Sequence, residues 1–101
     1  MTEEQIEQEI KKIGLTAPRV TPDDIDNLIE DVSYQVFHGR MTICVLRLKN
    51  GFLLSGESSC VSKENFNQEI GEKIAFQNAR DKIWMLEGYS LMQKVCSPHK
   101  L

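Results

Sequence analysis

The sequence predicts an α+β fold with two short N-terminal helices, a three-stranded antiparallel β-meander and a long C-terminal helix. Apolar residues have helical spacing before Ser33, alternate with polar residues after it, and return to helical spacing beyond Asn65. Two turn signals, Gly39-Arg40 and Asn50-Gly51, divide the alternating stretch into three strands. A run of consecutive antiparallel strands between helices is typical of the α+β class.

The charges divide the chain into two parts. Residues 1–31 hold nine acids and three bases, whereas residues 32–101 hold six acids and nine bases, and together they give the net charge of −3. We therefore expect one domain over residues 1–101, with an acidic helical segment before a basic core. The core favours an anionic partner, but its small excess of bases is far below that of a typical nucleic-acid-binding domain, so nucleic acid is not an expected partner.

Bulk composition narrows the class of protein. A hydrophobic content of 41% with 27% charged residues is ordinary for a globular chain, and no apolar run approaches the roughly 20 residues of a membrane span, so we expect no membrane partner. The acidic start Met1-Thr2-Glu3-Glu4 does not resemble a signal peptide, which predicts a cytoplasmic location. The three cysteines form no CxxC pair, so we expect neither disulfides nor a cysteine zinc site. The sequence has no GxGxxG, no Walker-type loop, no HExxH and no paired histidine spacing, so we expect no metal or cofactor.

Two helices are predicted in the acidic segment. The first begins with the capping box Thr2-x-x-Gln5 and ends near Gly14. The second begins at Thr21-Pro22, where a threonine cap precedes a proline at the first helical position. Its buried stripe is predicted from four apolar residues at helical spacing: Ile25, Leu28, Ile29 and Val32.

The strand register is predicted by treating both hairpins as two-residue loops, with a type II′ turn at Gly39-Arg40. One face of the sheet then carries Tyr34, Val36, Ile43, Val45 and Leu54, and the other carries Cys44, Leu46, Leu48 and Leu53. A sheet that is apolar on both faces needs cover on both sides. We therefore expect a homo-oligomer in which a neighbouring subunit supplies part of that cover.

The last helix is predicted from a cap at Asn65 to about Leu86, with a break at Gly88. Its core stripe is predicted to hold four large apolar residues: Phe66, Ile70, Ile74 and Ile83. Small residues recur every four positions, at Gly71, Ala75 and Ala79. A ridge of this kind allows another backbone to approach closely, which also favours self-association.

A candidate ligand surface lies on the last helix. Lys73, Gln77, Arg80 and Trp84 share one face, and Asn78 and Lys82 flank it. Two cations beside an indole suit an anionic aromatic ligand such as a nucleotide. The alternative is a solvated face in which Lys73 pairs with Glu69 and Trp84 packs partly into the core.

A second candidate lies where the third strand leads into the last helix. Glu57-Ser58-Ser59-Cys60 is predicted to line a cleft near Asn65, and Tyr89 is added as a ligand contact beyond the break at Gly88. Nucleophilic catalysis would need a histidine, but His38 lies beside a turn and His99 in the tail. We expect no catalytic residues and no enzymatic activity, and Ser58, Ser59 and Asn65 have the alternative role of satisfying backbone groups at the bend.

The order of these motifs resembles a family of small tailed-phage proteins called the gene 66 family. The resemblance covers about residues 34–95 and rests on Thr42-Ile43-Cys44, Leu48, Asn50-Gly51-Phe52, Gly56-Glu57-Ser58, Cys60, Asn65-Phe66, Gly71, Lys73, Ala75, Asn78-Ala79-Arg80, Lys82-Ile83-Trp84 and Leu86-Glu87-Gly88-Tyr89. It implies a viral or prophage origin and a non-structural accessory role in the host cytoplasm. It implies no enzymatic activity.

Small phage accessory proteins often disable host machinery, and some sequester nucleotide immune signals in a compact oligomer. By that analogy, the leading hypothesis is a homo-oligomeric binding protein that takes an anionic nucleotide-type ligand. The alternative is a protein-interaction module that inhibits a host protein through a helical surface, such as the acidic first helix. An enzyme ranks third.

Overall fold

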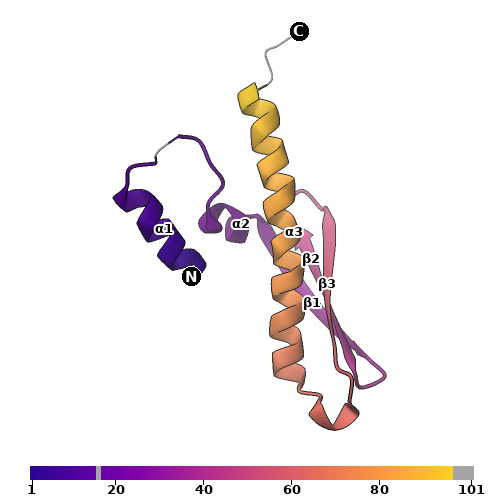
Figure 1. Ribbon diagram of the computed structural model, residues 1–101. Coiled ribbons are helices and arrows are strands. Elements are labelled where there is room, and N and C mark those ends of the chain that lie inside the picture. The colour runs from indigo at the N-terminus through magenta and orange to yellow at the C-terminus, as the bar shows by residue number, and fades with distance from the viewer. Residues whose placement is uncertain (16, 97–101) are drawn as a thin grey trace.

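The computed structural model describes residues 1–15 and 17–96. Two helices, a three-stranded sheet and a long helix follow one another in the chain: α1 (Glu3–Lys12), α2 (Pro22–Leu28), β1 (Ile29–Phe37), β2 (Met41–Leu48), β3 (Leu53–Ser59), the short 3-10 helix η1 (Lys63–Asn65) and α3 (Gln68–Cys96). The sheet is antiparallel with the strand order β1-β2-β3, and α3 runs along one face of it (Figure 1). The predicted fold class is confirmed.

The predicted capping box at Thr2 and the predicted cap at Thr21 both form, and the Thr21 cap is also a capping box. The Thr2 and Thr21 hydroxyls accept from the backbone N–H groups of Gln5 and Asp24, whose side chains accept from the two threonine N–H groups in return. The predicted end of α2 was wrong, because Ile29 and Val32 belong to β1 rather than to the buried stripe of a helix. Pairing with β2 takes over the backbone there, and Ile29 lies opposite Leu48.

Both hairpin loops are one residue longer than predicted. Phe37 lies opposite Met41, so three residues (38–40) separate β1 from β2, and the two residues at positive φ are His38 and Gly39 rather than Gly39-Arg40. At the second hairpin, the Leu48 N–H donates to the Phe52 carbonyl across three residues, with Gly51 at a φ of +91°.

This one-residue shift in each hairpin reassigns the two faces of the sheet, because side chains alternate along a strand. Tyr34 lies opposite Cys44 and Leu46 opposite Leu54, so all four share the face beneath α3. The predicted faces were therefore wrong. The opposite face mixes polar and apolar side chains from the three strands: Ser33, Gln35, Phe37, Met41, Ile43, Val45, Arg47, Leu53, Ser55 and Glu57.

Helix α3 differs from its prediction at three points. It is capped by Asn67, whose side chain accepts from the Ile70 N–H, rather than by Asn65. It also continues through Gly88 without a break. Ile70 and Ile74 are exposed, whereas the buried positions are Gly71, Ala75, Ala79, Arg80 and Ile83.

The small-residue ridge of α3 faces β3 because the two backbones lie very close together. A Cβ atom built on Gly56 would lie 2.2 Å from the Ala79 backbone nitrogen and 2.4 Å from the Ala75 carbonyl oxygen. No larger side chain fits between them, so the helix turns its glycine and alanines toward the strand. The ridge therefore serves packing within one chain.

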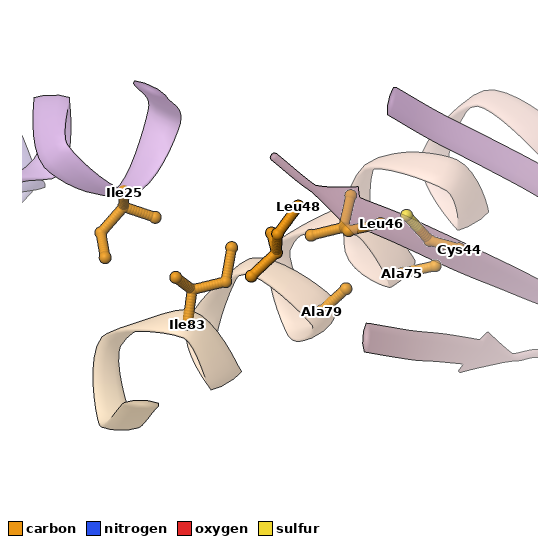
Figure 2. Close-up of a cluster of buried hydrophobic side chains, with 7 residues drawn as sticks. All are labelled: Ile25, Cys44, Leu46, Leu48, Ala75, Ala79 and Ile83. Atoms are coloured by element: carbon orange, nitrogen blue, oxygen red, sulfur yellow. The ribbon is translucent and has the colours of Figure 1, made fainter. Parts of the chain in front are cut away.

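The core is small and lies between α3, β2 and α2. Figure 2 shows Ile25 of α2 and Ile83 of α3 meeting at one end of a row of β2 and α3 side chains. The buried hydrophobic residues are Ile25, Cys44, Leu46, Leu48, Ala75, Ala79 and Ile83. Burial, together with the nearby carboxylate of Glu72, raises the pKa of the Cys44 thiol, which therefore stays protonated within the core.

Two parts of the molecule lie outside this core. The C-terminal end of α3 extends beyond the sheet, as does α1, which buries no side chain (Figure 1). Strand β1 is exposed along almost its whole length. Among the described residues, no helix is both long enough and apolar enough to cross a membrane.

Candidate functional site

A buried guanidinium lies at the centre of the largest polar network. Arg80 is only 5% exposed, and its Nε donates to the Asp26 carboxylate at 2.9 Å and its Nη1 to the Glu3 carboxylate at 2.6 Å. Burial by itself opposes the charge, but these hydrogen bonds outweigh that cost and raise the pKa of Arg80. The network joins α1, α2 and α3.

The same Glu3 carboxylate accepts from the Trp84 indole nitrogen at 3.2 Å. Arg80 and Trp84, predicted as the cation and the stacking ring of a ligand face, are thus bound to a carboxylate of the chain's own N-terminal helix. An anionic group does occupy the position that the sequence suggested for a ligand anion. In this structure both residues hold α1 against α3. Their role in ligand binding stays a prediction.

The other predicted residues on α3 have separate partners. Lys73 pairs with Glu69 at 3.5 Å in an exposed ion pair, and the Gln77 side chain donates to Asp81 at 2.8 Å. These are the contacts of a solvated helix face.

Asn78 and Lys82 lie on the side of α3 that faces β3. Asn78 donates to the Glu57 carbonyl at 2.8 Å, and the Lys82 ammonium donates to the Ser55 carbonyl at 2.5 Å. The two side chains hold backbone groups of the strand, and their role in ligand binding stays a prediction. Glu57 itself is exposed, and Tyr89 lies on the extension of α3 at 68% exposure.

A cleft near Asn65 does form between the third strand and the last helix, but Glu57 is not among the residues that line it. A cavity of about 150 Å³, called here the bend pocket, is lined by Arg40, Thr42, Ser58, Ser59, Cys60, Asn65, Phe66, Asn67, Ile70, Gly71 and Ile74. Hydroxyl, amide and guanidinium groups line it together with isoleucine and phenylalanine side chains. One cation among neutral donors and apolar walls suits a small anionic ligand.

Thr42 gives the bend pocket its most unusual feature. Its hydroxyl oxygen is buried and has no hydrogen-bond partner among the described residues. A Cβ atom on Gly71 would lie 2.7 Å from this oxygen, so glycine leaves the space in which the hydroxyl sits. A buried hydroxyl without a partner costs about 1–3 kcal/mol.

Sequence reasoning missed Arg40 and Thr42 as pocket residues. Arg40 was assigned to a two-residue turn, whereas its guanidinium reaches across to the Val61 carbonyl at 3.2 Å. Thr42 could have been found, because it alternates with Cys44, Leu46 and Leu48 and so shares their buried face. The Cys60 thiol donates to the Ser62 carbonyl, and His99 lies outside the described residues.

Comparison with known proteins identifies the family. No curated protein and no solved structure matches the chain. The family model described as the phage protein (N4 Gp49/phage Sf6 gene 66) family matches residues 20–95, which include α2, the whole sheet and nearly all of α3. The resemblance suggested by the sequence motifs is confirmed, and the chain belongs to this phage protein family.

Proposed function

We propose that this phage accessory protein is a non-enzymatic, homo-oligomeric binding protein that acts against host machinery in the host cytoplasm and takes a small anionic, nucleotide-type ligand. The observation that carries the proposal is the buried hydroxyl of Thr42 in the bend pocket, without a partner and close to Arg40. A pocket with an unpaired hydroxyl donor and a nearby cation suits an acceptor-rich anion such as a phosphate.

The size of the bend pocket also suggests how much of such a ligand it encloses. Its volume of about 150 Å³ is smaller than the roughly 300–1,000 Å³ of a pocket that encloses a drug-sized molecule. One group of the ligand fits inside, and the remainder lies at the mouth, where Ile70 and Ile74 present exposed apolar surface. Ser58, which the sequence also suggested, is a wall of this pocket.

Thermal unfolding of the purified protein with a panel of cyclic and linear nucleotides tests the ligand class. A ligand present at about 100 times its dissociation constant adds roughly 2.7 kcal/mol, which is roughly 10 °C for a domain of this size. Arg40→Ala should remove most of that shift, since a charge-assisted hydrogen bond is worth about 1.5–3 kcal/mol. Arg47→Ala, which removes an exposed arginine of β2 that does not line the bend pocket, is the matched control.

Thr42→Val provides a sharper test because the hydroxyl is the group assigned to the ligand. The variant should raise the free energy of unfolding of the ligand-free protein by about 1 kcal/mol, since a methyl group needs no hydrogen-bond partner. It should also weaken the nucleotide-induced shift. A variant that binds as tightly as the parent would contradict the assignment of the bend pocket.

A second candidate function is inhibition of a host protein through a helical surface. The extension of α3 beyond the sheet supports it, because that extension exposes large apolar side chains: Met85, Leu86, Tyr89, Met92 and Val95. Such a stripe suits a helix groove or a second helix. Tyr89→Glu with Met92→Glu should then abolish co-purification of a defined host protein and leave nucleotide-induced stabilisation intact, whereas equal recovery of that protein would exclude this surface.

A further inference from the structure

The outer edge of β1 is an open hydrogen-bonding surface. In β2, even-numbered residues pair with β3, as the Leu48 N–H to Phe52 carbonyl bond shows, so odd-numbered residues pair with β1. The partners of those odd residues are Ser33, Gln35 and Phe37. The N–H and C=O groups of Val32, Tyr34 and Val36 therefore point away from the sheet, and no described residue bonds to them.

On the face that α3 covers, the side chains along this edge are apolar and poorly covered, whereas Ser33 and Gln35 lie on the other face. Val32 is 37% exposed and Tyr34 is 40% exposed, because α3 lies over β2 and β3 rather than over β1. Long apolar edge strands pair readily with other strands, and proteins usually protect them with charges, prolines, bulges or a covering element. The start of β1 has two of these protections, the charges of Glu30 and Asp31 and a register shift between Ile29 and Asp31, but the stretch from Val32 to Phe37 contains no charge, proline or bulge.

We propose that β1 pairs antiparallel with β1 of a second copy of this chain, which joins the two sheets into one continuous six-stranded sheet. This inference rests on the homo-oligomer of the proposed function and names its interface. In the two-fold register centred on Tyr34, each Val32 lies opposite Val36 of the other copy, and the two Tyr34 residues lie opposite each other. Each of these pairs exchanges two backbone hydrogen bonds.

The sequence of β1 favours a second copy over an unrelated strand because it is complementary to itself in this register. Valine meets valine and tyrosine meets tyrosine on the α3 face, and cross-strand pairs of β-branched and aromatic residues stabilise a sheet. On the other face, Ser33 lies opposite Gln35, and Asp31 opposite Phe37. No like charges meet, because both acids at the start of the strand fall opposite uncharged residues or His38.

The pairing also places the two α3 helices on the same side of the joined sheet. Strands lie about 4.8 Å apart, so helices seated over β2 and β3 of each copy are separated by roughly four strand spacings, or about 20 Å. Since a helix is about 10–12 Å across, the helices do not collide. The floor between them is formed by the apolar side chains of the two β1 strands.

Molar mass by light scattering at about 5–200 μM, in the absence of ligand, tests the interface. The wild-type chain should be a dimer at the upper concentrations. Tyr34→Lys places two ammonium groups opposite each other at the two-fold axis, and such like-charge contacts cost several kcal/mol, so the dissociation constant should rise roughly 100-fold. Tyr34→Phe should remain dimeric, and so should Leu53→Lys, which adds the same charge at the opposite edge.

Cysteine cross-linking tests the register independently of any folding defect. In a Cys60→Ser, Cys96→Ser background, Ser33→Cys with Gln35→Cys should form a covalent dimer under mild oxidation, because the two positions face each other as a non-hydrogen-bonded pair. Ser55→Cys in that background should not. A wild-type monomer throughout would overturn both this interface and the homo-oligomer, whereas a Tyr34→Lys dimer would overturn edge pairing alone and leave the bend pocket untouched.

Discussion

The two edges of the sheet differ in how well the rest of the chain covers them. At β3, the outward carbonyls of Ser55 and Glu57 accept from the Lys82 and Asn78 side chains, and Gly56 lets α3 approach to contact distance. At β1, the outward backbone groups have no such partners among the described residues, and most of the side chains are exposed. One helix therefore protects one edge of the sheet and leaves the other open.

This difference shows that the exposed edge is not simply a consequence of small size. A chain of 101 residues with a long helix could have covered either edge, and the helix is fixed over β3 by residues suited to that contact: a glycine in the strand and a row of glycine and alanines in the helix.

The largest effect is expected at the helix–strand contact. Gly56→Ala places a Cβ within 2.2 Å of the Ala79 backbone nitrogen, and backbone cannot move aside as a flexible side chain can. We expect a loss of about 3 kcal/mol in the free energy of unfolding. Urea denaturation measures it, and Gly88→Ala is the control, since nothing lies within 4 Å of that position and alanine should gain up to about 1 kcal/mol.

A somewhat smaller effect is expected at the network that holds α1. Arg80→Ala leaves the Glu3 and Asp26 carboxylates without their shared cation and should cost about 2–3 kcal/mol. Trp84 should also lose its partner, so its fluorescence should shift as α1 moves away. Glu3→Gln keeps the hydrogen-bonding shape and should cost less than about 1 kcal/mol. If both variants lost the same free energy of unfolding, the stabilisation would come mainly from the docking of α1 and not from the buried guanidinium.

Removing the cover of β3 should have a modest effect on stability and a visible effect on assembly. Asn78→Ala with Lys82→Ala frees the Ser55 and Glu57 carbonyls, at a cost of about 1 kcal/mol. With both edges open, the protein should form species larger than the dimer at high concentration. A double variant whose size distribution matches wild type would show that the α3 backbone alone protects this edge.

The smallest effect concerns pH and α1. The hydrogen bond from Arg19 lowers the pKa of Glu7 below its usual range. A lowered carboxylate pKa stabilises the folded state above the unfolded pKa, and the contribution disappears as the pH falls through the folded value. Docking of α1 should therefore weaken in acid before the sheet unfolds. Glu7→Gln should remove this pH dependence of α1 protection from proteolysis, and an unchanged pH profile would contradict the assignment.

Features encoded locally could be predicted from the sequence. The helix caps at Thr2 and Thr21 and the alternation that marks three strands depend on residues a few positions apart, and all of them appear in the structure. The register could not be predicted, because it depends on a choice between two-residue and three-residue loops. The positive φ of His38, a residue with no special turn signal, decided the first of these loops.

Contacts between residues far apart in the sequence could not be predicted, for a different reason. The buried face of α3 is set by Gly56 on another strand, so the large Ile70 and Ile74 are displaced from it. The pairing of Arg80 with Glu3 joins the first helix to the last, 77 positions apart in the sequence. The opposite charge balance of the two segments was a clue to this pairing, but charge alone does not name partners.

Amide hydrogen exchange at β1 tests the central claim, that the open edge is closed by a second copy, most directly. The N–H groups of Val32, Tyr34 and Val36 should exchange quickly in dilute protein and become protected as concentration rises, while that of Gln35, bonded within the sheet, should be protected throughout. Rapid exchange of all three outward amides at concentrations where light scattering reports a dimer would contradict edge pairing.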